Sequence, residues 1–108
     1  MVMVKDIKSD DEFDKEVLTG LSAVAFKPSS GYELEKSWYN LAEMYPKVKF
    51  FEVDVDEQPT IADRGQIDRK NVSVTGVPMI QFYKDGGLIE SLLGDDLQVI
   101  GAFLNNWS

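Results

Sequence analysis

The sequence contains neither cysteine nor histidine. Without a thiolate, the chain cannot form a disulfide, bind zinc through sulfur or exchange a dithiol with a disulfide. Without an imidazole, it lacks the side chain that most often serves as a general base near neutral pH. Catalytic triads of the serine–histidine and cysteine–histidine types are therefore excluded.

Basic residues are also scarce, because 11 lysines and arginines stand against 19 aspartates and glutamates, a net charge of −8 at pH 7. Nucleic-acid phosphates and anionic membranes would repel such a chain, so neither is expected as a partner. No apolar run approaches the roughly 20 residues of a membrane-spanning helix, and the N-terminal segment lacks the apolar stretch of a signal peptide. We therefore expect an intracellular, cytoplasmic protein.

The composition is otherwise that of an ordinary globular protein. The chain has 108 residues, of which 44% are hydrophobic and 28% are charged, which excludes a disordered or collagen-like chain. The length is about that of one domain, and no repeat or linker interrupts it. We expect a single domain over residues 1–108.

Apolar spacing in the first part of the chain alternates between strand and helix. A strand is predicted over 2–7, and the Ser9-x-x-Glu12 pattern predicts a capped helix that ends near Gly20. The short apolar run 21–26 is typical of a strand buried on both faces.

The next segment has the strongest helical periodicity. A helix over 31–45 is indicated by four residues at three-and-four spacing, Leu34, Trp38, Leu41 and Tyr45. A second Ser-x-x-Glu pattern, Ser30 with Glu33, predicts its cap. Apolar residues on both faces of 48–55 predict an interior strand, parallel to the preceding one through a right-handed crossover.

The rest of the chain predicts a short helix near 61–64, a charged loop, a hairpin and a last helix. The hairpin joins 79–83 to 88–93 through the turn at 84–87. Asp95 or Asp96 caps the helix, whose apolar stripe is Leu97, Ile100, Leu104 and Trp107. This order predicts an α/β fold with a mixed sheet between helices.

Several short sequence motifs, spread over nearly the whole chain, resemble the thioredoxin family and most closely its cytosolic eukaryotic members. They are residues 3–7 followed by Phe13, 24–26, 51–56, 76–78, 81–86 and Gly94. The resemblance implies a thioredoxin fold, a five-stranded mixed sheet sandwiched between about four helices. It also implies that Pro78 follows a cis peptide bond.

The same resemblance shows that the family's redox chemistry is missing. The Cys-Gly-Pro-Cys active site falls on Gly31, Tyr32, Glu33 and Leu34, so no catalytic residue is expected. The family's buried acid falls on Ala25 and the neighbouring lysine on Glu52. The resemblance therefore implies a protein that cannot perform dithiol–disulfide exchange, and its enzymatic activity stays uncertain.

What the resemblance retains is a groove for an extended peptide of a partner protein, which needs no sulfur. We expect six residues to form it: Ser30, Gly31, Tyr32, Val77, Pro78 and Gly94. Tyr32 would be an exposed anchor or a solvated turn residue. The partner would be a protein or peptide, with no cofactor or metal, and the chain would be a monomer or a weak homodimer.

Two other functions stay open. Glutathione binding, or an activity like that of glutathione transferases, would use the hydroxyl of Tyr32 or Ser30. A structural subunit would instead cover an apolar patch near Trp38, Phe103 or Trp107 with its partner. The segment 64–73 is longer than the usual thioredoxin pattern, and its basic residues, Arg64, Arg69 and Lys70, could contact an acidic partner.

Overall fold

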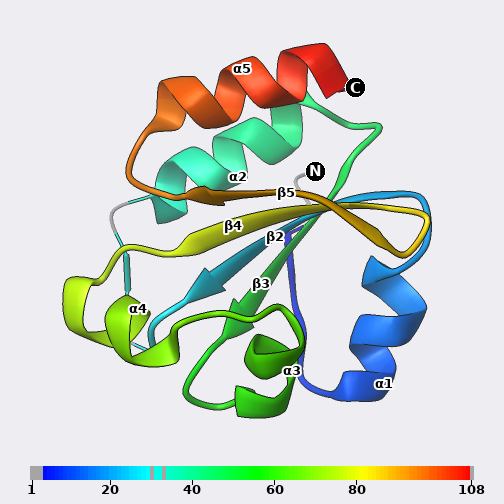
Figure 1. The fold of residues 1–108 in the computed structure, drawn as a ribbon. Coiled ribbons are helices and arrows are strands. Elements are labelled where there is room, and N and C mark those ends of the chain that lie inside the picture. Colours follow the sequence, from blue (N-terminus) through cyan, green and yellow to red (C-terminus); the bar gives the residue numbers. More distant parts are fainter. Residues whose placement is uncertain (1–3, 30, 33, 108) are drawn as a thin grey trace.

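A computed structural model describes residues 4–29, 31, 32 and 34–107. Within them, five strands form one sheet in the order β1-β3-β2-β4-β5 (Figure 1). The strands β1, β3 and β2 run parallel, while β4 is antiparallel to both β2 and β5, as the predicted crossover and hairpin require. Their bounds are β1 Val4–Asp6, β2 Leu21–Lys27, β3 Lys49–Asp54, β4 Met79–Lys84 and β5 Gly87–Leu93.

Helices cover both faces of the sheet, with α2 and α5 on one side and α1, α3 and α4 on the other (Figure 1). Their bounds are α1 Asp10–Glu12, continued by the π-helical turn η1 Phe13–Val17, then α2 Glu35–Met44, α3 Pro59–Arg64, α4 Arg69–Thr75 and α5 Leu97–Trp107. The predicted sheet, sandwich and fold class are confirmed. Among the described residues, no helix is long and apolar enough to cross a membrane.

The described residues contain five α-helices rather than about four, because α4 lies where a charged loop was expected. Asp68 caps α4 by accepting the N–H of Asn71 at 3.0 Å, and Val72 is buried against the sheet. Gly76 ends the helix with φ of 72°, a left-handed conformation that glycine adopts without strain. One buried residue in seven thus suffices to dock this short helix, which is too few for a periodic signal in the sequence.

The first helix begins at its predicted cap, whereas the start of α2 differs from the prediction. The Ser9 hydroxyl accepts the N–H of Glu12 at 3.1 Å, as the capping pattern predicts, and the Glu12 carboxylate accepts the N–H of Lys8. The helix α2 begins at Glu35, about one turn after the predicted start at 31. Ser30 and Glu33, the expected cap of that helix, lie outside the described residues.

Each face of the sheet has its own hydrophobic cluster. Phe26, Phe51 and Val53 point toward α1, α3 and α4, whereas Phe50, Ile80 and Phe82 point toward α2 and α5. This alternation follows from the two-residue period of a strand. Because helices cover both faces of β2 and β3, the sequences of these two strands are nearly continuous apolar runs.

Candidate functional site

The expected groove residues belong to segments that meet at one end of the sheet. The strand β2 ends there, α2 begins there, and the connections before β4 and after β5 return to the same end (Figure 1). The chain leaves β2 toward β3 on one side, and later places β4 on the other side of β2. Ligand sites of open α/β sheets lie at such carboxyl ends, where the strand order reverses.

A hollow of about 230 Å³ lies between these segments. It is smaller than the roughly 300–1,000 Å³ of pockets that hold drug-sized ligands. The hollow is lined by Leu34, Ser37, Gly76, Val77, Pro78, Gly94, Asp95 and Leu97.

Three of the six expected binding residues line this hollow, namely Val77, Pro78 and Gly94. Tyr32 faces a separate, shallow hollow beside Glu35, Lys36, Tyr39 and Asn40. Gly31 is exposed and is not among the residues that line either hollow. Ser30 lies outside the described residues.

Gly94 and Pro78 form the tightest contact of the hollow. The Gly94 N–H donates to the Pro78 carbonyl at 2.8 Å. A Cβ on Gly94 would lie 2.6 Å from Pro78 Cγ and 2.8 Å from Pro78 O, which is closer than such atoms can approach. Only glycine therefore lets the turn after β5 pack this closely on Pro78.

The Val77–Pro78 peptide bond is trans, since no cis peptide bond occurs within the described residues. The prediction of a cis bond is therefore wrong. The trans form agrees with the general preference of X–Pro bonds, which favours trans by about 0.5–1 kcal/mol. The Val77 N–H donates to the Thr75 hydroxyl at 3.1 Å. That backbone donor is consequently occupied within the chain, which weakens the expectation of strand-like recognition through it.

Tyr32 is not an exposed anchor, because only 7% of it is accessible to solvent. Its hydroxyl donates to Glu52 Oε2, on the neighbouring strand β3. Burial, followed by this hydrogen bond to a carboxylate, raises the pKa of Tyr32. The hydroxyl is thus neither free nor acidic enough to activate a bound thiol, and the use of Tyr32 in glutathione chemistry is not supported.

Glu52 is the centre of a buried polar cluster beneath the start of α2. It is 3% exposed, and its other oxygen, Oε1, lies 3.6 Å from Lys27 Nζ and 3.4 Å from the Tyr39 hydroxyl. Ala25 lies directly opposite Glu52 on β2. A buried carboxylate must be paired and hydrogen-bonded to be tolerated, and Tyr32, Tyr39 and Lys27 provide this.

Replacing Tyr32 with phenylalanine is expected to lower the free energy of unfolding by about 1.5–3 kcal/mol, the range for hydrogen bonds to charged groups. The variant keeps the ring but removes the only hydrogen-bond donor that the described structure gives to Oε2 of the buried Glu52. Urea denaturation followed by circular dichroism measures the change.

Tyr39→Phe is the matched control, because its hydroxyl donates to the same carboxylate at the long distance of 3.4 Å from a residue that is 38% exposed. Its expected loss is smaller, below about 1 kcal/mol. If Tyr32→Phe costs the same in a Glu52→Leu background, which has no acceptor, as in the wild type, the Glu52 hydrogen bond is not the cause.

Alkaline pH is expected to destabilise the fold through the buried tyrosines. Burial raises the pKa of Tyr83 to about 12, and the pKa of Tyr32 is also raised, from an ordinary value of 10.0. Between pH 10 and 12 the folded state therefore retains protons that the unfolded state has lost, so the free energy of unfolding falls as pH rises. Urea denaturation at pH 9, 10 and 11 should show the fall, and Tyr83→Phe should reduce its slope; constant stability over this range would contradict it.

Five lining residues of the hollow were not among the predicted binding residues, namely Leu34, Ser37, Gly76, Asp95 and Leu97. Leu97 was assigned to the apolar stripe of the last helix, but it is 44% exposed beside the hollow. Asp95 and Asp96 were alternative caps, and Asp96 is the cap, since it accepts the N–H of Gln98 and Val99. Leu97 could have been identified from its position at the exposed start of a helix, and Asp95 from being the acid that the helix cap does not need. Ser37 carried no such signal in the sequence.

The predicted basic patch of 64–73 is largely neutralised. Arg64 forms ion pairs with Asp10 at 3.3 Å and Asp14 at 2.6 Å, and its guanidinium lies over the Phe13 ring. Arg69 pairs with Asp63 at 3.1 Å. Arg64 thus links α3 to α1 and η1, and Arg69 links α4 to α3, while Lys70 is exposed.

The aromatic residues considered for a covered patch are part of the core. Trp38 is fully buried. Phe103 and Trp107 are partly buried and pack with Phe82, with ring centroids 4.3 and 5.5 Å from it. They hold α5 against the sheet.

No family model matches the sequence. A thioredoxin of Callithrix jacchus is 29% identical over 113 residues, covering 97% of this chain and 99% of that protein. Two Arabidopsis thaliana proteins also match: monothiol glutaredoxin-S17, 31% identical over 86% of this chain, and the inactive TPR repeat-containing thioredoxin TTL3, 34% identical over 83%. The chain spans only 18% and 13% of the lengths of those two.

Solved structures agree with the fold. The thioredoxin of Malassezia sympodialis superposes with a TM-score of 0.81 and 26% identity, covering 98% of this chain and 91% of that one. Plasmodium falciparum thioredoxin gives a TM-score of 0.83 and 25% identity over 97% of this chain and all of that one.

Proposed function

Because this chain is a thioredoxin-like protein that contains no cysteine, we propose that it is a redox-inactive module that binds a segment of a partner protein in the hollow between α2 and the Val77–Pro78 connection. Reduction of a disulfide needs a thiolate, which the chain cannot supply. The observation that carries the proposal is this hollow at the sheet end, lined by the apolar residues Leu34, Val77, Pro78 and Leu97.

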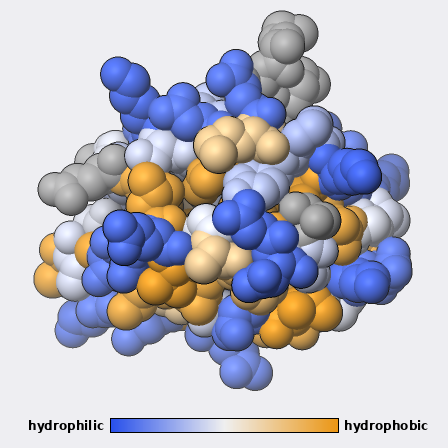
Figure 2. Space-filling model, turned by 90° about the horizontal axis from the view of Figure 1, so that it is seen from above, coloured by the Kyte–Doolittle hydropathy of each residue, from blue (hydrophilic) through white to orange (hydrophobic). Residues whose placement is uncertain are grey.

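The geometry supports recognition by side-chain insertion more than by main-chain pairing. The Val77 N–H is already bonded to Thr75, whereas Leu97 presents an apolar side chain at the rim. Burial of one apolar side chain of a partner against such a surface contributes about 1.5–3 kcal/mol. Figure 2 views the molecule from the side of α2 and α5, where hydrophobic side chains reach the surface among hydrophilic ones.

The experiment is a selection of binders from a library of random twelve-residue peptides, followed by titration of the best synthetic peptide. Replacing Leu97 with serine is expected to weaken binding about tenfold, which corresponds to ~1.4 kcal/mol of lost apolar contact. Val99→Ser is the matched control, since Val99 is 46% exposed on the same helix and does not line the hollow.

Amide chemical-shift changes on titration locate the bound peptide. Changes centred on Val77, Gly94 and Leu97, together with a loss of affinity in Leu97→Ser alone, support the proposal. If no peptide is selected, or if both serine variants bind equally well, the hollow is not the binding site.

A further inference from the structure

We propose that the hollow selects a partner segment that carries a lysine or arginine next to its inserted apolar side chain, with the cation facing Asp95. This inference rests on the proposed function and adds the chemistry of the partner. It follows from where the charges of the molecule lie, both at the hollow and away from it.

Among the residues that the structure describes, Asp95 is the only charged one that lines the hollow. It is exposed, and it forms no hydrogen bond or ion pair with any residue in the described part of the chain. Its neighbour Asp96 is committed to the helix, because its Oδ1 accepts the N–H of Gln98 at 3.0 Å and of Val99 at 3.3 Å. The carboxylate of Asp95 is therefore available to a partner, and the α5 cap does not depend on it.

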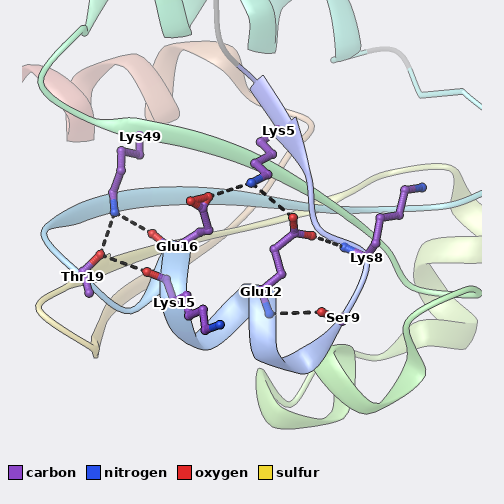
Figure 3. A network of polar contacts seen from close by, with 8 residues as sticks. All are labelled: Lys5, Lys8, Ser9, Glu12, Lys15, Glu16, Thr19 and Lys49. Carbon is purple, nitrogen blue, oxygen red and sulfur yellow. Dashed lines mark hydrogen bonds and ion pairs between the residues drawn. The ribbon is translucent and has the colours of Figure 1, made fainter.

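More than half of the basic residues are engaged away from the hollow in the described structure. Figure 3 shows Lys5 bound to Glu12 and Glu16, and Lys49 held by the Glu16 carbonyl and Thr19. The other ion-paired cations are Lys8, Lys27, Arg64 and Arg69. Six of the 11 basic residues are thus occupied outside the hollow, and none of the described residues that line it is basic.

The net charge of −8 adds a long-range component of the same sign. A cationic segment would be attracted during its approach, and an acidic one repelled, with both effects weakening as salt rises. The net charge alone gives no preferred position along the peptide. Asp95, fixed beside the apolar lining, would set the distance between the cation and the inserted side chain.

In the test, twelve-residue peptides are selected separately for binding to three forms of the protein: wild type, Asp95→Lys and Glu43→Lys. The sequences of the selected peptides are then compared. Glu43 is exposed at the far end of α2 from the hollow, so its variant makes the same charge change without touching the lining. We expect wild type and Glu43→Lys to enrich lysine or arginine at one spacing from an apolar residue. Asp95→Lys should lose that preference or enrich aspartate and glutamate.

A titration gives the magnitude. Asp95→Asn is expected to bind a selected lysine-bearing peptide about two- to five-fold more weakly than wild type, as for an exposed ion pair, and the difference should shrink in 1 M salt. Thermal unfolding of each variant verifies that it is folded.

The outcomes separate this inference from the proposed function. Peptides that depend on Leu97 but show no cationic preference overturn the charge selectivity and leave the binding site standing. A preference lost equally in Glu43→Lys and Asp95→Lys reports only the net charge, and also overturns it. If no selected peptide loses affinity in Leu97→Ser, the proposed function itself fails.

Discussion

Replacing Trp38 with alanine is expected to lower the free energy of unfolding by about 3–5 kcal/mol, the range for large aromatic residues removed from cores. Trp38 is fully buried between α2 and the sheet, and its ring centroid lies 4.9 Å from that of Phe50 in an edge arrangement. Its Nε1–H donates to the Phe51 carbonyl at 3.2 Å. The variant loses the packing, the ring contact and the hydrogen bond together.

Urea denaturation measures this loss, and Trp107 remains as the fluorescent reporter. Trp38→Phe should cost less, because it retains much of the buried volume and loses mainly the N–H donor. Met44→Ala is the surface control, since Met44 lies on the same helix and is 66% exposed, and its effect should stay within about 0.5 kcal/mol. A Trp38→Ala transition within 1 kcal/mol of the wild type would show that α2 does not depend on this side chain.

Replacing Gly94 with alanine is the second change with a large expected effect, a loss of about 1–3 kcal/mol from overpacking. The new Cβ would lie 2.8 Å from the Pro78 carbonyl oxygen, which is backbone and cannot move aside as a flexible side chain could. The turn after β5 would have to shift away from Pro78, straining the 2.8 Å hydrogen bond between them. Because both residues line the hollow, peptide affinity should fall as well.

Gly101→Ala is the matched control for this prediction. Gly101 lies inside α5, and a Cβ there would meet nothing within 4 Å. Alanine is better than glycine in a helix by about 0.5–1 kcal/mol, so this variant should be more stable than the wild type. Opposite signs for the two substitutions, measured as midpoints of thermal unfolding, support the steric argument; a Gly94→Ala variant as stable as the wild type contradicts it.

Glu52 illustrates which part of the site could be predicted by matching this sequence to the family and which part could not. The resemblance identified Ala25 and Glu52 as replacements at the family's acid and lysine positions. Only the structure shows that Glu52 is itself buried and bound by the hydroxyl of Tyr32. A buried carboxylate thus lies on β3 beside Tyr32, one of the positions that the resemblance matched to the family's active site.

The candidate site was predicted in part. Val77, Pro78 and Gly94 do lie together, because the order of strands brings the connections before β4 and after β5 to the end of β2. Tyr32 was misplaced, since a tyrosine near a helix start carries no local sign of whether its ring points inward or outward. The prediction of a cis Val77–Pro78 bond was also wrong, because it was taken from the family resemblance and not from the neighbouring residues.

The amino-acid sequence by itself determined that this chain has no thiol chemistry, and it determined the order of the strands and main helices. Those properties depend on composition or on residues within a few positions of one another. Only the tertiary structure decided that Tyr32 is bound to Glu52, that Arg64 is neutralised by Asp10, and that Leu97 and Asp95 border one hollow. These partners lie 20 residues apart in the first case and 54 in the second. Such distant pairs are brought together by the packing of separate elements, which local sequence patterns do not encode.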